Sequence, residues 1–478
     1  MRILNFTLPD GVHILEEYFI CDGKVKITMA KQIGEMLYLV EEPPLTKEDA
    51  ESYAAVMNAL EASMKPPPAN VELISYLESE LSRVIREYDL KGIDASRFRY
   101  YILRDLSYGE IYAMMNDPNI EDVKCPGYNI PFKIRHRRGR GWLNTNLALD
   151  ESEMDALASK LAHLAGTTVS VGAPIVDACL PDRSRINICF RKEVSPLGTS
   201  VSIRKFRAEP WTIVHLIYDL KMLNELIAVY LWLMLEEKKC IVFFGPTGSG
   251  KTTLMNAVAA LIRPDSYVLT IEETPELNLP HSNWESLVTR QSYSFGHIGE
   301  IDLESLAKIS LRKRPDYVIM GEIRGREAYV FFAAASTGHG GLCTVHAEST
   351  DSLLRRLTSE PMNIPKDNVG MISVVVETKE AELPTGNKVR RVTAVNEINE
   401  SGYTKLFEWS MKDEFKPDKA EALTKGSSLI RSIMEEKGWE ENRFKKEVAR
   451  RTEFFKRANT LGAKEFRDLE RELLKFYD

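Results

Sequence analysis

Eight consecutive residues near the middle of the chain have the types and spacing that a phosphate-binding loop requires. They are Gly245, Pro246, Thr247, Gly248, Ser249, Gly250, Lys251 and Thr252, which fit the pattern G-x-x-x-x-G-K-[ST]. The glycines let successive backbone N–H groups point at phosphate oxygens, and Lys251 is expected to reach the β- and γ-phosphates. The Thr252 hydroxyl is expected to ligate Mg²⁺, with Thr253 beside it. The alternative is a glycine-rich turn without a ligand, but the apolar run before the loop and the helical pattern after it favour phosphate binding.

Two glutamates that follow apolar runs farther along the chain are candidate catalytic carboxylates. Glu272 follows the predicted strand 267–271, and Glu322 follows the predicted strand 317–320. Hydrolysis of a nucleoside triphosphate needs one group that orients the attacking water and another near the metal ion. Such groups lie at the carboxyl ends of strands in open parallel sheets, although either glutamate alone is also explained as an exposed turn residue. Because Asp316 precedes the second strand, Glu322 is expected to supply the carboxylate on the water or Mg²⁺ side.

Two histidines bracket a short predicted strand in the segment 338–346. His339 precedes the strand and His346 follows it. A single histidine is usually structural, whereas two at the rim of one sheet would be suited to sensing the γ-phosphate or relaying its loss to a neighbouring subunit. The spacing leaves both interpretations open.

Alternating strand and helix patterns from residue 240 onward are the elements that must position these residues. Strands are expected at 240–244, 267–271, 317–320 and 342–345, and helices at 252–261, 303–312 and 326–335. This alternation predicts an α/β domain with a largely parallel, buried sheet. Between about 100 and 204, short stretches of alternating apolar and polar residues predict an α+β domain with an antiparallel sheet.

Composition shifts divide the chain into five expected segments. These are a small N-terminal domain of unassigned role (1–95), the α+β domain (96–208), a hinge linker (209–212), the ATP-binding α/β domain (213–410) and a charged helical subdomain (411–478). Three consecutive prolines at 66–68 interrupt helix-like sequence and predict a stiff break within the first segment.

Composition and charge exclude several classes of protein. With 478 residues, 44% apolar and 28% charged, the chain is unlike disordered, collagenous or coiled-coil proteins. The net charge of −7 argues against nucleic-acid binding over the whole surface. The N-terminus lacks a signal-peptide pattern, the longest apolar run (226–235) is too short to span a bilayer, and the six cysteines form no C-x-x-C pair. These features predict a cytoplasmic chain with reduced thiols.

Several ordered motifs together resemble the type II/IV secretion ATPase superfamily, which also serves type IV pili and archaella. Residues 245–253 resemble its Walker A motif, and residues 270–276 resemble its Asp box. Its atypical Walker B motif is resembled by residues 311–316 with 321–324, and its His box by residues 336–339 with 344–347. The family's strands that carry arginine fingers are resembled by residues 185–187 and 201–204. The phrases STGHGGLCTVHAE and GRGWLNTN most resemble the archaeal branch. The similarity extends over roughly residues 100 to 400.

The resemblance implies a RecA-like P-loop domain with ATP and Mg²⁺ as cofactors. By position, it implies that Lys251 and Thr252 bind phosphate and Mg²⁺, that Glu272 polarises the attacking water, and that Glu322 supports the metal and the γ-phosphate. It further implies that Arg185 and Arg204 are arginine fingers. Arg324 belongs to the Walker B motif, and Glu273 stands where the family usually has aspartate, which puts a Mg²⁺-related role of that position in doubt.

The resemblance also implies a homohexameric ring on the cytoplasmic face of a polytopic membrane platform protein. Its ATP-driven motion would push prepilin-like subunits into a pilus-like filament. The alternatives are an archaellum motor ATPase and, less favoured, a nucleic-acid-translocating P-loop protein. The basic cluster 133–140 is interpreted as a solvated hairpin, with a subunit or lipid contact as the alternative.

Overall fold

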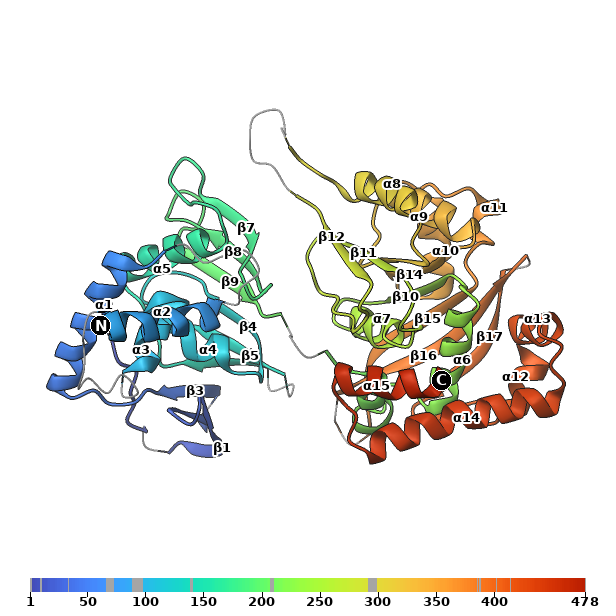
Figure 1. Cartoon of the computed structure of the whole chain (residues 1–478), viewed down its shortest axis with the longest axis horizontal. Coiled ribbons are helices and arrows are strands. Elements are labelled where there is room, and N and C mark those ends of the chain that lie inside the picture. Colours follow the sequence, from blue (N-terminus) through green and yellow to red (C-terminus); the bar gives the residue numbers. More distant parts are fainter. Residues whose placement is uncertain are drawn as a thin grey trace. The chain divides into compact units, whose positions relative to one another are not determined.

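The chain folds into two compact units, residues 1–207 and 208–478 (Figure 1). The computed structural model describes residues 2–8, 11–32, 34–65, 73–87, 98–137, 141–206, 210–290, 299–384, 386, 388–400, 402–412 and 414–477. The predicted hinge at 209–212 begins next to the division between the units, and its first residue lies outside the described ranges, as do the three prolines at 66–68. Each unit is therefore considered by itself.

The first unit is built on an antiparallel sheet, which the alternating patterns predict for residues 100–204 but which also includes three strands between residues 13 and 41. Within the described ranges it has nine strands in the order β1-β2-β3-β6-β5-β4-β9-β8-β7, and β3 with β6 is the one parallel pair. The strands are β1 (His13–Ile20), β2 (Val25–Gln32), β3 (Glu35–Glu41), β4 (Ile120–Cys125), β5 (Lys133–His136), β6 (Trp142–Thr145), β7 (Ile175–Cys179), β8 (Arg185–Cys189) and β9 (Ser200–Arg204). On β8 and β9 the buried residues alternate with exposed ones, so this part of the sheet has one open face.

The helices of this unit are α1 (Lys47–Ser63), α2 (Leu73–Glu87), α3 (Arg99–Leu106), α4 (Tyr112–Asn116) and α5 (Glu151–Leu164), with a short 3₁₀ turn, η1 (Gly109–Ile111). The start of α5 is set by Asp150, whose carboxylate accepts the N–H of Glu153 while the Glu153 side chain accepts the N–H of Asp150. Apolar side chains of α3, α4 and α5 share one buried cluster with the strands.

The boundary that we expected near residue 95 does not separate two compact units. Strand β3 pairs with β6, and a buried ion pair joins the same two stretches of chain, since Arg104 Nη1 lies 3.0 Å from Glu42 Oε2. The Tyr100 hydroxyl donates to the other Glu42 oxygen at 2.7 Å. Sequence reasoning placed the boundary by composition, and composition does not reveal strand pairing across it.

The ammonium group of Lys205, near the end of this unit, is held by carbonyl oxygens. Its Nζ donates to Met114 O at 3.0 Å and to Asp117 O at 2.6 Å, and burial lowers the pKa of Lys205 to about 8. The ordinary pKa of lysine, which applies to the unfolded chain, is 10.5. Between pH 8 and pH 10.5 the unfolded chain therefore binds more protons than the folded chain, and the free energy of unfolding rises with pH.

Lys205→Arg should remove this pH dependence, because arginine does not titrate in that range. In urea unfolding, the wild type should gain about 1 kcal/mol over the variant between pH 8 and about pH 9.5. A difference between the two proteins that stays constant with pH would contradict the prediction.

The second unit contains the predicted α/β fold, and its sheet is largely parallel. Among the described residues its strand order is β12-β11-β13-β14-β10-β15-β16-β17-β18, with parallel pairing from β12 to β15 and antiparallel pairing from β15 onward. The strands are β10 (Ile241–Gly245), β11 (Val268–Glu272), β12 (Trp284–Val288), β13 (Tyr317–Met320), β14 (Gly340–His346), β15 (Val374–Glu382), β16 (Lys388–Asn399), β17 (Gly402–Ser410) and β18 (Glu414–Lys416). The residues of β10, β11 and β13 are all buried, as expected for inner strands covered on both faces.

Helices of the second unit bury these strands. They are α6 (Glu225–Glu236), α7 (Lys251–Ala259), α8 (Leu303–Lys313), α9 (Glu327–Ser336), α10 (Thr350–Thr358), α11 (Lys366–Val369), α12 (Ala420–Gly426), α13 (Ser428–Glu436), α14 (Glu441–Thr460) and α15 (Phe466–Tyr477), preceded by a π-helical turn, η2 (His215–Asp219). The apolar run 226–235 is fully buried in α6. In the described part of the chain, no helix combines the length and apolarity needed to cross a bilayer. All six cysteines are free thiols.

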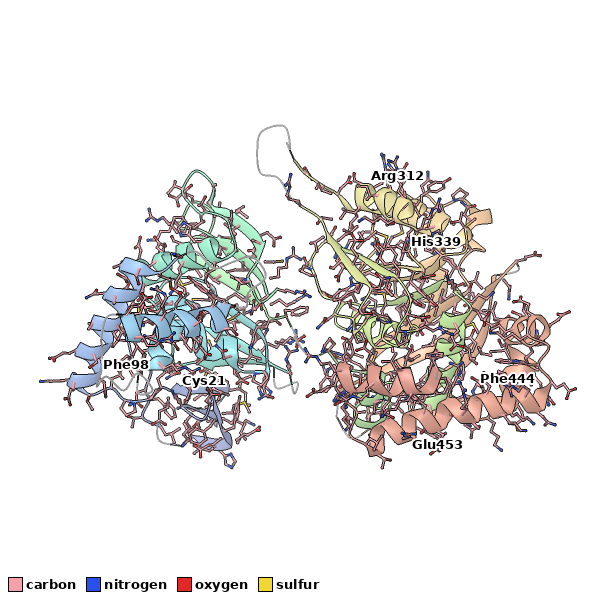
Figure 2. The ribbon with its side chains drawn as sticks, viewed as in Figure 1. Cys21, Phe98, Arg312, His339, Phe444 and Glu453 are labelled. Atoms are coloured by element: carbon pink, nitrogen blue, oxygen red, sulfur yellow. The ribbon has the colours of Figure 1, made fainter. Side chains whose placement is uncertain are left out.

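The C-terminal helices share the core of this unit instead of forming a separate body. Phe444 of α14, labelled in Figure 2, packs in the same buried cluster as α6 and α7. Glu397 on β16 anchors α13, because its buried carboxylate accepts hydrogen bonds from the Tyr230 hydroxyl at 2.8 Å, from Ser427 Oγ, and from Ser428 N at 2.8 Å.

Glu397→Ala should lower the free energy of unfolding by about 3 kcal/mol, because it leaves several buried donors without an acceptor. Glu397→Gln keeps one acceptor oxygen and should cost about 1 kcal/mol. Urea unfolding is the measurement, and exposed Glu400→Ala is the matched control. An alanine variant as stable as this control would show that the anchor contributes little.

Candidate nucleotide-binding site

The predicted phosphate loop connects β10 to α7. Gly245 closes the strand where a side chain has no room, since a Cβ there would lie 2.1 Å from the carbonyl oxygen of Thr378. Gly250 has a left-handed backbone (φ +93°) and caps α7. The buried Ser249 hydroxyl lies 2.9 Å from Thr378 Oγ1 on β15, which fixes the inner wall of the loop. Helix α7 thus begins directly after the loop, and its N-terminus is placed as anion binding requires.

Lys251 lies at the first position of α7 and is buried. Its Nζ donates to Pro246 O at 2.9 Å and to His346 Nδ1 at 3.2 Å. Burial lowers the pKa of Lys251, and the negative charges of Glu322 and Glu276 oppose that shift. The ammonium is therefore held over the loop by neutral acceptors, which phosphate oxygens are able to replace.

The carboxyl ends of four strands bring the predicted residues to one edge of the sheet. Gly245 is the partner of His346 in the β10–β14 pair, and Met320, two residues before Glu322, is the partner of Cys343 in the β13–β14 pair. Glu272 ends β11, which pairs with β13. The edge therefore presents the phosphate loop, His346, Glu322 and Glu272 in that order.

His346 bridges the loop lysine and a candidate catalytic carboxylate. Its Nδ1 faces Lys251 Nζ, and its Nε2 lies 3.1 Å from Glu322 Oε1. Burial and the charge of Lys251 lower the pKa of His346, so the imidazole is neutral at pH 7. Since lysine only donates and a carboxylate only accepts, the neutral ring accepts at Nδ1 and donates from Nε2. Hydrogen bonds through this histidine therefore connect Lys251 to Glu322.

Arg324 holds Glu322 from the other side. Its Nε lies 2.5 Å from Glu322 Oε1 and its Nη2 2.7 Å from Oε2, while its Nη1 lies 3.6 Å from Glu273 Oε2. Burial raises the pKa of Glu322, but the hydrogen bonds from Arg324 and the neighbouring positive charges outweigh it, so the pKa stays below the ordinary value. Sequence reasoning placed Arg324 and Glu273 in separate motifs and missed their contact.

Glu272 is buried, and one of its carboxylate oxygens is hydrogen-bonded to the loop that follows β11. Its Oε1 accepts the N–H groups of Glu276 at 2.9 Å and Leu277 at 3.0 Å. Gly321 packs against it, since a Cβ at that position would lie 3.0 Å from Glu272 Cγ. The Thr344 hydroxyl donates to Gly321 O at 2.6 Å and so fixes the turn into Glu322. The two glutamates are thus carried by neighbouring, rigid strand ends.

Oxygen ligands suited to Mg²⁺ are present at this edge, although the described residues contain no group of three or more metal-ligating side chains. Thr252 offers a hydroxyl in the first turn of α7, and Glu322 offers a carboxylate. Mg²⁺ at nucleotide sites takes few protein ligands and fills its shell with phosphate oxygens and water. This donor set fits the ion.

His339 is not brought to this edge. It precedes β14, whereas His346 ends it, so the two lie about 20 Å apart along a seven-residue strand. His339 Nδ1 lies 3.1 Å from Thr337 Oγ1 and 3.2 Å from Ala334 O, near the end of α9 (Figure 2). Of the two interpretations that the spacing left open, the placement of His339 agrees with the structural one, because the residues before and after a strand occupy opposite edges of the sheet.

The predicted arginine fingers lie in the first unit, on the open face of its sheet. Arg185 on β8 and Arg204 on β9 are direct cross-strand partners, and both side chains are exposed. Arg185 forms a bidentate ion pair with Asp177 (2.7 and 3.0 Å), and Arg204 Nε lies 3.4 Å from Asp122. The two guanidinium groups are thus presented together.

The basic cluster 133–140 begins on β5 of the same sheet. Arg135 is exposed on this strand, and Arg137 Nε donates to Pro118 O at 2.9 Å. Residues 138–140, where the hairpin turn was predicted, lie outside the described residues.

Comparisons with known proteins agree with these motifs. The family model described as "Type II/IV secretion system protein" matches residues 136–379, about half of the chain. An uncharacterized protein of Methanocaldococcus jannaschii is 33% identical over 448 residues, which cover 85% of this chain and 78% of that protein. The type IV secretion system protein PtlH of Bordetella pertussis is 30% identical over 266 residues (51% of this chain, 78% of that protein). The solved VirB11 ATPase of Brucella suis is 26% identical and covers 60% of this chain and 94% of that one, with a TM-score of 0.29. The chain belongs to the type II/IV secretion system protein family.

Proposed function

We propose that the chain is an ATPase that works as a homohexamer at the inner face of the cell membrane and powers the assembly of a type IV pilus-like filament. The observation that carries the ATPase assignment is the continuous contact from Lys251 through His346 to Glu322, at the edge of the sheet where the phosphate loop lies. Family membership and the similarity to a type IV secretion system protein support the secretion context.

The residues of the site have distinct roles in this proposal. Lys251 exchanges Pro246 O and His346 for the β- and γ-phosphates when ATP binds. Thr252 and Glu322 hold Mg²⁺, which neutralises phosphate charge when bound. Glu272 orients the attacking water and accepts its proton. His346 loses its contact with the lysine on ATP binding and regains it when phosphate leaves, which relays the state of the nucleotide to Glu322 and Arg324.

The direct test is ATP hydrolysis by the purified chain over a range of protein concentrations. We expect turnover that requires Mg²⁺, stops with a chelator, and rises as rings form, as judged by analytical ultracentrifugation. No hydrolysis in any assembled state would refute the proposal.

Stimulation of ATP hydrolysis by DNA across a salt series would instead favour a nucleic-acid-translocating enzyme. Deleting the gene should abolish surface adhesion, and loss of swimming alone would favour an archaellum motor.

Glu272→Gln should reduce ATP turnover by about 100-fold, because it removes the negative charge that orients the water and accepts its proton. The amide keeps an oxygen that is able to accept the N–H groups of Glu276 and Leu277, so the loop should stay folded. Nucleotide affinity should change little. Turnover within a few-fold of the wild type would assign the role of base to another residue, and Glu322→Gln would then be examined.

A further inference from the structure

The β15–β16 hairpin flanks the phosphate loop on the side opposite His346. Strand β10 has β14 on one side and β15 on the other. The β10–β15 pairing runs from Ile241 with Val374 to Phe244 with Glu377. Strand β15 then continues to Glu382, beyond the end of the pairing, with Thr378 in contact with Ser249 of the loop. The hairpin therefore stands beside the site where phosphates would bind.

Arg390 on β16 crosses directly over the end of the phosphate loop. A Cβ at Gly250 would lie 3.6 Å from Arg390 Cδ and 3.1 Å from Met222 Cε. Met222 is held in place because its carbonyl oxygen accepts the N–H of Val392 at 2.8 Å. Gly250 is the cap of α7, so the aliphatic stem of Arg390 rests where the helix N-terminus opens. A side chain at position 250 would crowd Met222 Cε, whereas Arg390 Cδ lies at an ordinary van der Waals distance.

Glu380 on β15 is the cross-strand partner of Arg390, but it forms its ion pair with Lys388. The Arg390 side chain is exposed, and among the residues that the structure describes it has no ion-pair partner. Its basic neighbours are engaged: Lys379 Nζ lies 2.7 Å from Glu377, Lys388 Nζ 3.7 Å from Glu380, and Arg391 Nη1 donates to Leu220 O at 2.9 Å. An exposed arginine that the described residues leave without an ion pair, beside a helix N-terminus, is suited to binding an anion.

We propose that Arg390 binds the phosphate chain of the nucleotide within its own subunit, from the flank opposite His346. This rests on the proposed nucleotide-binding function. The planar guanidinium pairs with two phosphate oxygens at once, which a lysine does not reproduce. Arg390 is thus distinct from Arg185 and Arg204, which belong to the other unit, and the P-loop pattern does not extend to it.

Calorimetric titration of the full-length protein with ADP tests this assignment. Arg390→Ala should raise the Kd about tenfold, since charge-assisted hydrogen bonds to phosphate are lost. Arg390→Lys should recover only part of the affinity. Lys388→Ala removes the same charge from an exposed position two residues away on the same strand, and should stay within about twofold of the wild type. Thermal melting verifies that each variant is folded.

The outcomes separate this inference from the proposed function. An Arg390→Ala affinity within twofold of the wild type, or an equal loss in Lys388→Ala, would overturn the role of Arg390 while leaving nucleotide binding intact. If Arg390→Ala loses affinity equally for ADP and GDP, a contact with the phosphates is supported. A loss of affinity confined to ADP would overturn the phosphate contact, because it would indicate a contact with the base instead. A wild-type protein that binds neither nucleotide would overturn the proposed function and this inference together.

Discussion

Lys251→Ala is expected to reduce ATP turnover by about 100- to 1,000-fold, the range observed when a preorganised donor to the developing charge is removed. The ammonium is buried at the N-terminus of α7 and is held by Pro246 O and His346 Nδ1, both of which a phosphate oxygen is able to replace. ADP affinity should fall as well, because the lysine contacts the phosphates in the ground state. Turnover and ADP titration measure the two effects.

The matched control is Lys308→Ala, which removes an exposed lysine that pairs with Glu304 on α8. It should leave turnover unchanged within about twofold, since exposed ion pairs contribute little. An equal loss in both variants would point to a general effect of charge. Unchanged turnover in Lys251→Ala would remove the ATPase proposal altogether.

We propose that Arg185 and Arg204 act as arginine fingers. Replacing both with alanine is then expected to reduce turnover about 1,000-fold, which is within the range known for such residues. The two residues are cross-strand partners on an exposed sheet face, and aspartates orient both side chains. ADP affinity should change far less than turnover, because such arginines act mainly on charge that develops in the transition state. Arg135→Ala, on strand β5 of the same sheet, which β4 separates from β9, is the control.

Mixing variants tests whether these arginines act between subunits. An arginine-deficient protein has intact phosphate loops, and Lys251→Ala has intact arginines. If the arginines complete the site of a neighbour, rings assembled from both proteins should regain part of the turnover that neither has alone. No recovery in verified mixed rings would show that the arginines act within their own subunit. Full activity of the double variant would give the transition-state role to Arg390 or to another cation.

The sequence by itself was sufficient for the order and type of the elements that carry the site. Strands covered on both faces appear as continuous apolar runs, and the phosphate loop is a local backbone motif. The strand and the loop at 240–253 are therefore recognised from one continuous stretch of sequence. The carboxylates of Glu272 and Glu322 were located because catalytic groups of a parallel sheet follow its strands. The buried α6 and the antiparallel sheet between about residues 100 and 204 were predicted for the same local reasons.

Tertiary structure alone decided which residues meet. His339 and His346 look equivalent in sequence, yet the direction of β14 places only His346 beside Lys251. Strand order joins Arg324 to Glu273, and strand pairing between β3 and β6 merges the two segments that composition divides near residue 95. Arg390 lies 139 residues after Lys251 and has no motif, but the hairpin brings it over Gly250. Local patterns specify elements because the backbone has few conformations, whereas contacts across a sheet depend on strand order and register, which no local pattern records.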